Sequence, residues 1–386
     1  MSSRPRFRAL EDIVEEELRR IQEASATPVP SLTTAEEADL SGVLWDYCRT
    51  EDKFPVFTNL SEARLTEIRQ YMQPFLERHR RRGPPPKISV NDSLILLLYL
   101  YKTGADFETT ATHMRYKAST LRAAVERIRP VLNETLVSKW WSERRRPRPF
   151  EGPYPYIALA LDGTTIPCYR PTGPFHEAKH YWSAHHGLYG VNYEVAVLAS
   201  APHYCLFVQP GVPGSVHDYT RLKETYTAYL DYLTKTTTEQ TMIESDGENA
   251  SWAVVCDLAY VGPAEDTPGF RKITGKKGAL TAADRQRNQE LARIRVVVEQ
   301  FFGRANNLWA CIRRTYKWDH TNIDMDVTNC FLLTNEHIKG KSLDTSDSDF
   351  YLQEQEARLK HHEEKVGRKR ASYAKSKAAK RRRIGA

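Results

Sequence analysis

The chain has 386 residues, of which 40% are hydrophobic and 27% are charged, and its formal net charge is +7. This length and apolar content suffice for one large domain and one or two small ones. The six cysteines lack a CxxC spacing, which argues against a zinc finger or a disulfide framework and favours reduced thiols inside a cell. The first residues lack the apolar stretch of a secretory signal, and the longest dense apolar run, 94–100, is too short to span a bilayer, so we expect no membrane partner.

Residues 1–82 are expected to form an N-terminal helical region. The helical pattern covers residues 9–50 and 61–82, and a Gly-Pro-Pro-Pro run at 83–86 ends it, because consecutive prolines cannot continue a helix. The pattern assigns no function to residues 1–60.

Residues 83–142 are predicted to be an all-α helix-turn-helix domain. Ser89 with Asp92 fits a capping box, and the helix that begins there should stop at Gly104. A short second helix is expected over 106–114, followed by a turn.

The third helix of this unit is the candidate recognition helix. We expect Ser119 to cap it and Pro130 to kink or shorten it. In such units the last helix enters the DNA major groove, although many three-helix units bind no DNA. The DNA-binding candidates lie in the turn, in this helix and in the basic linker after it: Arg115, Lys117, Thr120, Arg122, Arg129, Arg144, Arg145 and Arg146.

Residues 150–340 are predicted to form an α/β domain. Strands in series, then helix, strand and long helix indicate a mixed sheet with helices packed on it. Residues 234–248 are polar and threonine-rich, so we expect a surface loop there. The expected strands cover 156–161, 191–200, 203–209 and 252–257, and the expected helices cover 215–233 and 281–309.

Three carboxylates of this domain stand out. Asp162 and Asp257 each end an apolar strand, and Glu299 lies in an apolar helical stretch. Ionised carboxylates in such places are costly unless a divalent cation such as Mg²⁺ binds them, and two aspartates with one glutamate suit a two-metal phosphoryl-transfer site. The aspartates could instead be ordinary turn residues, and Glu299 could pair with Arg295 or Arg304.

Other side chains of the domain have two interpretations each. Lys272, Lys276 and Lys277, between the second and third acids, could line a DNA path or form a solvated basic loop. Ser215 and Asp218 fit a capping box at a helix start. An exposed aromatic residue could stack on a flipped base, although core or sheet positions are the ordinary interpretation for Trp182, Tyr189 and Tyr193.

The stretch from Asp162 to about Trp309 resembles the DDE transposases of the PIF/Harbinger-like group. Residues 159–164 (LALDGT) resemble the first-aspartate strand, and residues 256–262 resemble a second aspartate followed by an aromatic residue and a glycine. Residues 295–303 match the helical pattern R…VE..FG. Further likenesses, to a GS.HD element and to an aromatic, glycine-rich strand pair, lie at 213–218 and 179–192.

The resemblance implies an RNase H-like mixed sheet with flanking helices. It also implies that Asp162, Asp257 and Glu299 are a catalytic DDE triad and bind two Mg²⁺ (or Mn²⁺) ions. Asp162 would bridge both ions, Asp257 would hold one and Glu299 the other. The implied reaction is cut-and-paste transposition, in which double-stranded DNA is cleaved at terminal inverted repeats and the freed 3′-hydroxyl is joined to target DNA.

The family also suggests partners for the chain. A homodimer or higher oligomer is expected because two ends of the element must be brought together, and a separate Myb/SANT-like accessory protein is possible. Two other functions stay open: a host-adopted, non-catalytic nuclear DNA-binding protein, and a structure-specific nuclease without strand transfer.

Residues 341–386 are expected to be a charged, disordered tail. The basic runs at 368–370 and 380–383 resemble a bipartite nuclear localisation signal, which predicts a nuclear protein. The same residues could instead hold DNA without sequence preference.

Overall fold

The structure is a computed structural model. It describes residues 42–343 except 80–84, 145, 150, 151, 185, 244, 245, 247, 248 and 277. The predictions for most of the N-terminal region, for Arg145, for Lys277 and for nearly all of the tail therefore lie outside the described residues. Within the described part, no helix combines the length and the apolarity that a membrane span requires.

The described chain begins with an all-helical part, and the helix-turn-helix function expected for 83–142 stays a prediction. Helix α6 is capped by the Ser89 side chain, which accepts a hydrogen bond from the Asp92 N–H at 3.1 Å, and it ends at left-handed Gly104. The Asp92 carboxylate accepts from the Trp45 N–H at 2.9 Å, so it ties α3 to α6. The helices are α3 (Val43–Thr50), α4 (Phe54–Thr58), α5 (Glu62–Arg78), α6 (Val90–Thr103), α7 (Phe107–His113) and α8 (Ala118–Ser142).

Helix α8 differs from the prediction. Its N-cap is Lys117 rather than Ser119, and it runs through Pro130 for 25 residues. Proline removes one helical hydrogen bond, but α8 packs against α5, α6 and α15, and this tertiary packing keeps it continuous. Most of α8 is therefore a core helix, and only its N-terminal turns could reach a DNA groove.

The rest of the described chain is a mixed α/β unit around a seven-stranded sheet. The central strand β1 (Ile157–Pro167) pairs antiparallel with β3 (Leu188–Leu198) and parallel with β6 (Ala253–Cys256). The strand order is β2-β3-β1-β6-β7, and the short strands are β2 (Trp182–Ser183), β4 (Cys205–Val208), β5 (Val212–Pro213) and β7 (Lys272–Ile273). This agrees with the predicted mixed sheet and is consistent with a DDE nuclease fold.

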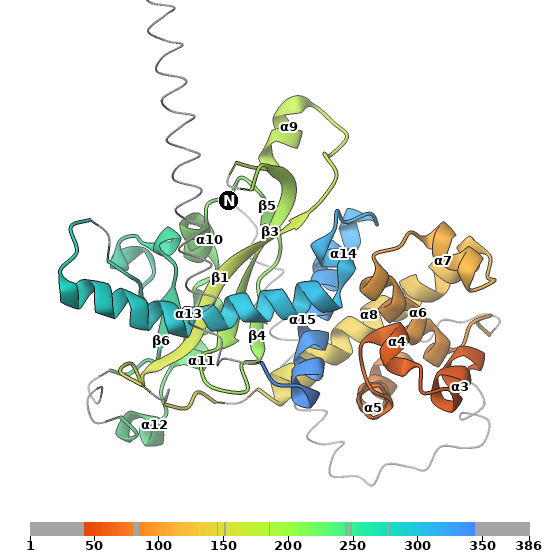
Figure 1. Cartoon of the computed structure of the whole chain (residues 1–386), viewed down its shortest axis with the longest axis horizontal. Helices are drawn as coiled ribbons and strands as arrows, with labels where there is room; N and C mark the ends of the chain where they lie inside the picture. Colours follow the sequence, from red (N-terminus) through yellow and green to blue (C-terminus); the bar gives the residue numbers. More distant parts are fainter. Residues whose placement is uncertain are drawn as a thin grey trace, which may run out of the picture.

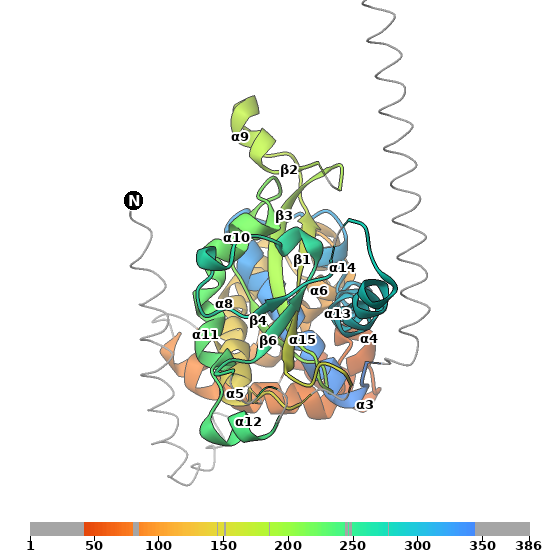
Figure 2. The ribbon, with the colours of Figure 1, turned by 90° about the vertical axis from the view of Figure 1, so that its left-hand side faces the viewer.

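Helices cover both faces of this sheet. Figure 2 shows α13 on one side and α10 and α11 on the other, and in Figure 1 α13 crosses in front of β1 while α9 projects beyond the body. The helices are α9 (Phe175–His180), α10 (Asp218–Thr225), α11 (Thr227–Leu233), α12 (Thr237–Thr241), α13 (Ala282–Leu308), α14 (Ala310–Arg313) and α15 (Ile323–Gly340), with short 3₁₀ turns at Leu258–Tyr260, Ala264–Asp266 and His320–Asn322.

Two expected segments need correction. The helix expected over 215–233 is divided at Tyr226 into α10 and α11. The stretch 234–248, expected to be a surface loop, contains α12, and its Lys235 and Asp246 are buried and form an ion pair of 2.6 Å.

The helical part and the sheet part share one hydrophobic core. Buried ion pairs also join α8 to α15. Arg129 Nε donates to Asp326 Oδ1 at 2.8 Å, and Lys139 Nζ donates to Glu336 Oε1 at 2.5 Å. Arg129, expected to bind DNA, is only 2% exposed, so its role is to hold the two parts together.

Candidate active site

The register of β1 and β6 brings the two aspartates to the same place. The last parallel pair joins Leu161 to Cys256, so Asp162 and Asp257 are the next residues on adjacent strands. Ligands in α/β sheets bind at this carboxyl edge of parallel strands. Asp162 was expected at the end of its strand, but β1 continues to Pro167 because β3 pairs with it beyond the point where β6 ends.

The long helix α13 brings the glutamate to the same site. Glu299 and Arg295 lie one helical turn apart, on a helix that packs against β1, β3 and β6. Arg295 Nη1 lies 2.8 Å from Glu299 Oε1 and 3.4 Å from Asp162 Oδ2. About a fifth of each side chain is exposed, 19–21%, so solvent reaches the cluster. The anticipated ion pair of Glu299 with Arg295 is therefore present, and it includes Asp162.

Electrostatic coupling shows that the three acids share one site. The pKa of Asp162 is raised from 3.8 to about 7, mainly by burial; the charges of Glu299 and Asp257 add to the rise, and Arg295 partly opposes it. Burial lowers the pKa of the Arg295 guanidinium, but Asp162 and Glu299 outweigh that effect and keep the pKa raised. The Arg295 guanidinium thus offsets part of the cost of burying the charged form of Asp162.

The donor set suits a hard divalent cation. Carboxylate oxygens are the ligands that Mg²⁺ and Mn²⁺ prefer, and the excess of acidic charge would be offset by such an ion. Within the described ranges, no three His, Cys, Asp or Glu side chains already lie close enough together to hold an ion. Metal binding would therefore require the carboxylates to move closer, and Arg295 would have to release at least one of them.

A further carboxylate, Asp218, lies against β1 at Gly163, on the face opposite that of Asp162, because neighbouring strand residues point to opposite faces. A Cβ atom added to Gly163 would lie 3.2 Å from Asp218 Oδ1 and 3.6 Å from the Tyr260 hydroxyl oxygen. The predicted capping box of Ser215 and Asp218 is wrong, because the N-cap of α10 is His217, whose ring accepts from the Tyr219 N–H at 3.3 Å.

The DNA candidates before α8 lie on the surface. Arg115, at a positive φ of 57°, and Lys117 are exposed in the turn between α7 and α8, and Thr120 is half-buried. The exposed Arg122 guanidinium lies 4.6 Å from the centre of the Phe107 ring. The DNA contact of this turn stays a prediction.

The linker arginines have protein partners. Arg144 stacks on Trp141, with its guanidinium carbon 3.8 Å from the ring centre, and lies 3.4 Å from Asp231. Arg146 pairs with Glu239 at 2.6 Å and also donates to backbone carbonyls of 232 and 234. They fasten the linker to α11 and α12.

Two lysines between Asp257 and Glu299, Lys272 and Lys276, differ in their exposure and in their partners. Lys272 is half-buried in β7, and its ammonium group lies 4.8 Å from the centre of the Tyr219 ring with no hydrogen-bond partner. Lys276 is exposed and pairs with Asp284 at 2.6 Å. Lys276 is therefore better placed than Lys272 to meet a phosphate.

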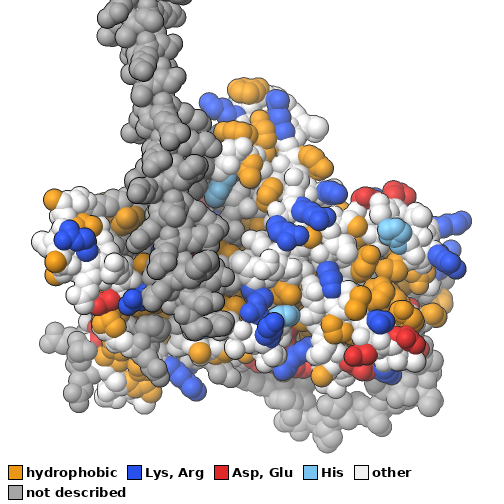
Figure 3. Space-filling view, viewed as in Figure 1, with side chains coloured by type: hydrophobic (Ala, Val, Ile, Leu, Met, Phe, Trp, Pro, Cys, Tyr) orange, Lys and Arg blue, Asp and Glu red, His pale blue; other side chains and the backbone are white. Residues whose placement is uncertain are grey.

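Sequence patterns did not reveal a further group of exposed basic residues, which lies next to the α6–α7 connection. Arg314 donates to the Thr103 carbonyl at 3.4 Å, and Trp318, beside exposed Lys317, donates to the Ala105 carbonyl at 3.2 Å. Because these contacts link residues far apart in the chain, periodicity could not predict them. Figure 3 shows Lys and Arg side chains spread over this face.

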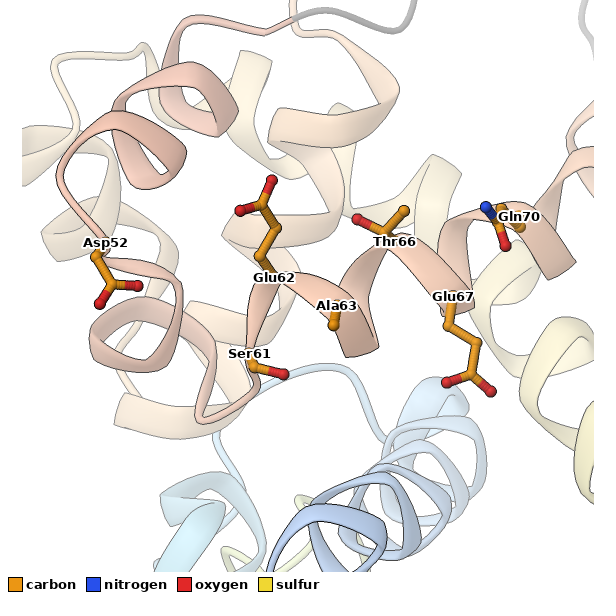
Figure 4. A pocket seen from close by; sticks show the side chains of 7 residues that line it. All are labelled: Asp52, Ser61, Glu62, Ala63, Thr66, Glu67 and Gln70. Carbon is orange, nitrogen blue, oxygen red and sulfur yellow. The ribbon is translucent and has the colours of Figure 1, made fainter.

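The pocket in Figure 4 lies away from the carboxylate cluster, along α5. It is lined by Asp52, Ser61, Glu62, Ala63, Thr66, Glu67 and Gln70. Its acids repel polyanions, and Glu62 and Glu67 already pair with Arg49 at 2.7 Å and Lys139 at 2.9 Å. These ion pairs explain the pocket as part of the helical scaffold.

One family model matches the part of the chain that carries this site. No curated protein and no solved structure gives a significant match to the chain. Residues 161–335, which include Asp162, Asp257, Arg295 and Glu299, match a family model described as DDE superfamily endonuclease. This match supports a DDE transposase-like endonuclease family for the domain that carries the carboxylate cluster.

Proposed function

We propose that the chain is a DNA transposase of the PIF/Harbinger-like group that binds terminal inverted repeats and carries out strand cleavage and strand transfer. Asp162, Asp257 and Glu299 are its catalytic triad. The observation that carries the proposal is the meeting of two strand positions and one helix position, far apart in the chain, around Arg295. The endonuclease family match covers the same residues.

The three acids would hold two Mg²⁺ or Mn²⁺ ions. Such ions supply Lewis acidity and lower the pKa of a water molecule or of a DNA 3′-hydroxyl. The carboxylates would hold the metal ions in fixed positions. Because the side chains of Asp162 and Glu299 are partly exposed, a phosphate can approach them. Arg295, once it releases a carboxylate, remains close enough to pair with a phosphate oxygen.

The proposal includes the partners of the reaction. Double-stranded DNA is the substrate, and the exposed residues Arg115, Lys117 and Arg122 are the described candidates for its backbone contacts. A dimer or higher oligomer, a possible Myb/SANT-like accessory protein and a nuclear location remain part of the proposal.

Cleavage of the element's own terminal repeats tests the proposal. With Mg²⁺ or Mn²⁺, the wild type should cut the repeats and join them to target DNA. Asp162→Asn and Glu299→Gln should each lose about a thousandfold in rate, the equivalent of several kcal/mol of lost metal-assisted stabilisation. Glu290→Gln is the matched control, because Glu290 lies on the same helix and accepts from the Tyr154 hydroxyl at 3.1 Å.

The assay also separates the rival functions. The ion pair of Arg295 with Asp162 and Glu299 is the observation that favours a non-catalytic DNA-binding protein, since it neutralises the acids without a metal. Binding of the repeats without cutting would support that function. Nicked products that are never joined would support a nuclease without strand transfer, and unchanged activity of Asp162→Asn would reject the triad.

A further inference from the structure

Between β1 and β3 the chain leaves the body of the molecule and forms an arm, residues 168–184, that carries α9 and β2 (Figure 1). The arm is held at its base by backbone hydrogen bonds. The Gly190 N–H donates to the Tyr181 carbonyl at 2.8 Å, and the Ser215 N–H donates to the His180 carbonyl at 2.9 Å. Ala178 of α9 is fully buried, so the arm has a defined conformation.

The arm presents large aromatic side chains to solvent. Phe175 is 67% exposed, Tyr169 is 60% exposed and Trp182 is 40% exposed. Single exposed aromatic residues are ordinary on protein surfaces, but a group of them on one projecting segment indicates an interaction surface. Of the aromatic candidates for stacking, Trp182 is exposed, whereas Tyr193 of β3 is only 1% exposed.

Cations lie among these rings. The Arg170 guanidinium carbon lies 5.8 Å from the centre of the Phe175 ring, and Lys179, His176 and His180 are exposed on α9. Glu177 is the one acidic residue in the sequence of the arm. Figure 3 shows apolar and basic side chains side by side at this end of the molecule. Aromatic faces combined with positive charge are the features by which proteins bind unpaired nucleic acid.

The arm continues directly from the strand that carries the candidate catalytic aspartate. From Asp162 to Pro167 the strand advances five residues, or roughly 17 Å at the usual rise of a β-strand. DNA advances about 3.4 Å per nucleotide of a strand, so this distance corresponds to about five nucleotides. A duplex that runs along β1 with a phosphate at Asp162 would therefore reach the base of the arm.

We propose that the arm binds DNA beside the phosphate at the triad, and that Phe175 stacks on an unpaired base there. Arg170 and Lys179 neutralise the adjacent phosphates. The proposal rests on the proposed DNA-cleaving function and adds a contact outside the triad. Its role is to stabilise open DNA beside the cleavage position, and it takes no part in the chemical step.

Charge favours DNA over a second copy of the chain as the occupant. If two arms packed together, their positive charges would repel each other. The cores of protein interfaces are also depleted of charged residues. A DNA strand supplies both an aromatic base for the ring and phosphates for the cations.

Binding of the full chain to fluorescently labelled DNA in EDTA tests this inference. The probes are a short duplex that is fully paired and the same duplex with a small thymine bubble. The wild type should prefer the bubble. Phe175→Ala should weaken bubble binding about fivefold to a hundredfold, the range expected for one lost stacking contact, and leave binding of the paired duplex unchanged. Phe175→Trp should keep the preference.

Tyr47→Ala is the matched control, because Tyr47 is also an exposed aromatic residue, at 48%, and lies on α3. Its preference should equal that of the wild type. A Phe175→Ala variant that binds both probes like the wild type would overturn the inference and leave the triad proposal intact. A Phe175→Ala variant that keeps the preference for the bubble but changes from dimer to monomer in light scattering would also overturn the inference. A wild type that binds neither probe would overturn the inference and count against the proposed DNA-cleaving function as well.

Discussion

Arg295 joins Glu299, one turn along α13, to Asp162 on β1, at distances of 2.8 Å and 3.4 Å from its Nη1 atom. The ion pair therefore stabilises the packing of the helix on the sheet at the point where catalysis is proposed. The same guanidinium competes with any metal ion for the carboxylates. Fold stability and metal affinity should depend on Arg295 in opposite directions.

Replacement of Arg295 by methionine tests this competition. Without metal, Arg295→Met should lower the free energy of unfolding by about 1–3 kcal/mol, because the carboxylates lose a charged hydrogen-bond donor. Added Mn²⁺ should raise its melting temperature more than that of the wild type, because binding to the folded state stabilises it. The measurement is thermal unfolding with and without Mn²⁺. Arg293→Met, at an exposed position of the same helix, is the control, and an equal Mn²⁺ response in both variants would contradict the competition.

The raised pKa of Asp162 predicts a pH dependence of stability. Its pKa in the folded state is about 7 and its ordinary value is 3.8, so the folded protein holds the proton more tightly. The resulting stability is fully present below about pH 4 and is lost as the pH rises through about 7, at no more than about 1.4 kcal/mol per pH unit. Chemical unfolding in EDTA between these pH values should show this slope in the wild type and not in Asp162→Asn. Identical slopes would refute the assignment.

Metal should reverse this loss, because the ion binds the deprotonated carboxylate and its affinity increases with pH. At a pH above the Asp162 pKa, added Mg²⁺ should stabilise the wild type and have little effect on Asp162→Asn.

Local sequence predicted the elements whose boundaries depend on nearby residues. Ser89 and Gly104 delimit α6, and Thr281 caps α13, because capping side chains and left-handed glycines act within one turn. The positions of Asp162, Asp257 and Glu299 on strand, strand and helix followed from the same kind of pattern.

Contacts between distant segments could not be predicted in this way. The neighbours of Arg129 in the sequence are polar and helical, as is typical of a surface residue. Its partner Asp326, however, lies 197 positions away in the chain. Asp162 is mid-strand because of β3, and Arg295 reaches it only because α13 crosses β1. Most side chains of the arm are exposed because no other segment of the described chain covers them. A local sequence pattern cannot predict this.

The buried Arg129–Asp326 pair predicts a large effect of a single substitution. Tyr101 and Tyr316 also donate to Asp326, at 2.5 Å and 2.6 Å, so Arg129→Met would leave this carboxylate buried without its cation. The expected loss is about 3–5 kcal/mol in the free energy of unfolding. Urea unfolding followed by tryptophan fluorescence measures it.

The control for this experiment is Arg122→Met, because Arg122 is exposed on the same helix. A surface substitution of this kind should change stability by no more than about 0.5 kcal/mol. Equal urea midpoints for the two variants would show that α8 is not anchored to α15 through Arg129.

Two glycines near the acids predict opposite effects of the same substitution. A Cβ on Gly262, which follows the turn after Asp257, would lie 1.9 Å from the Tyr219 ring, whereas a Cβ on Gly303 in α13 would have no atom within 4 Å. Gly262→Ala should therefore push the Tyr219 ring away from the turn, disturb its 2.6 Å hydrogen bond to Asp266 and lower both stability and cleavage. Gly303→Ala should raise stability by about 1 kcal/mol, because alanine favours a helix. Thermal unfolding of both variants beside the wild type measures these changes in stability. A Gly262→Ala protein as stable and active as the wild type would show that the close packing of this turn on Tyr219 does not position Asp257.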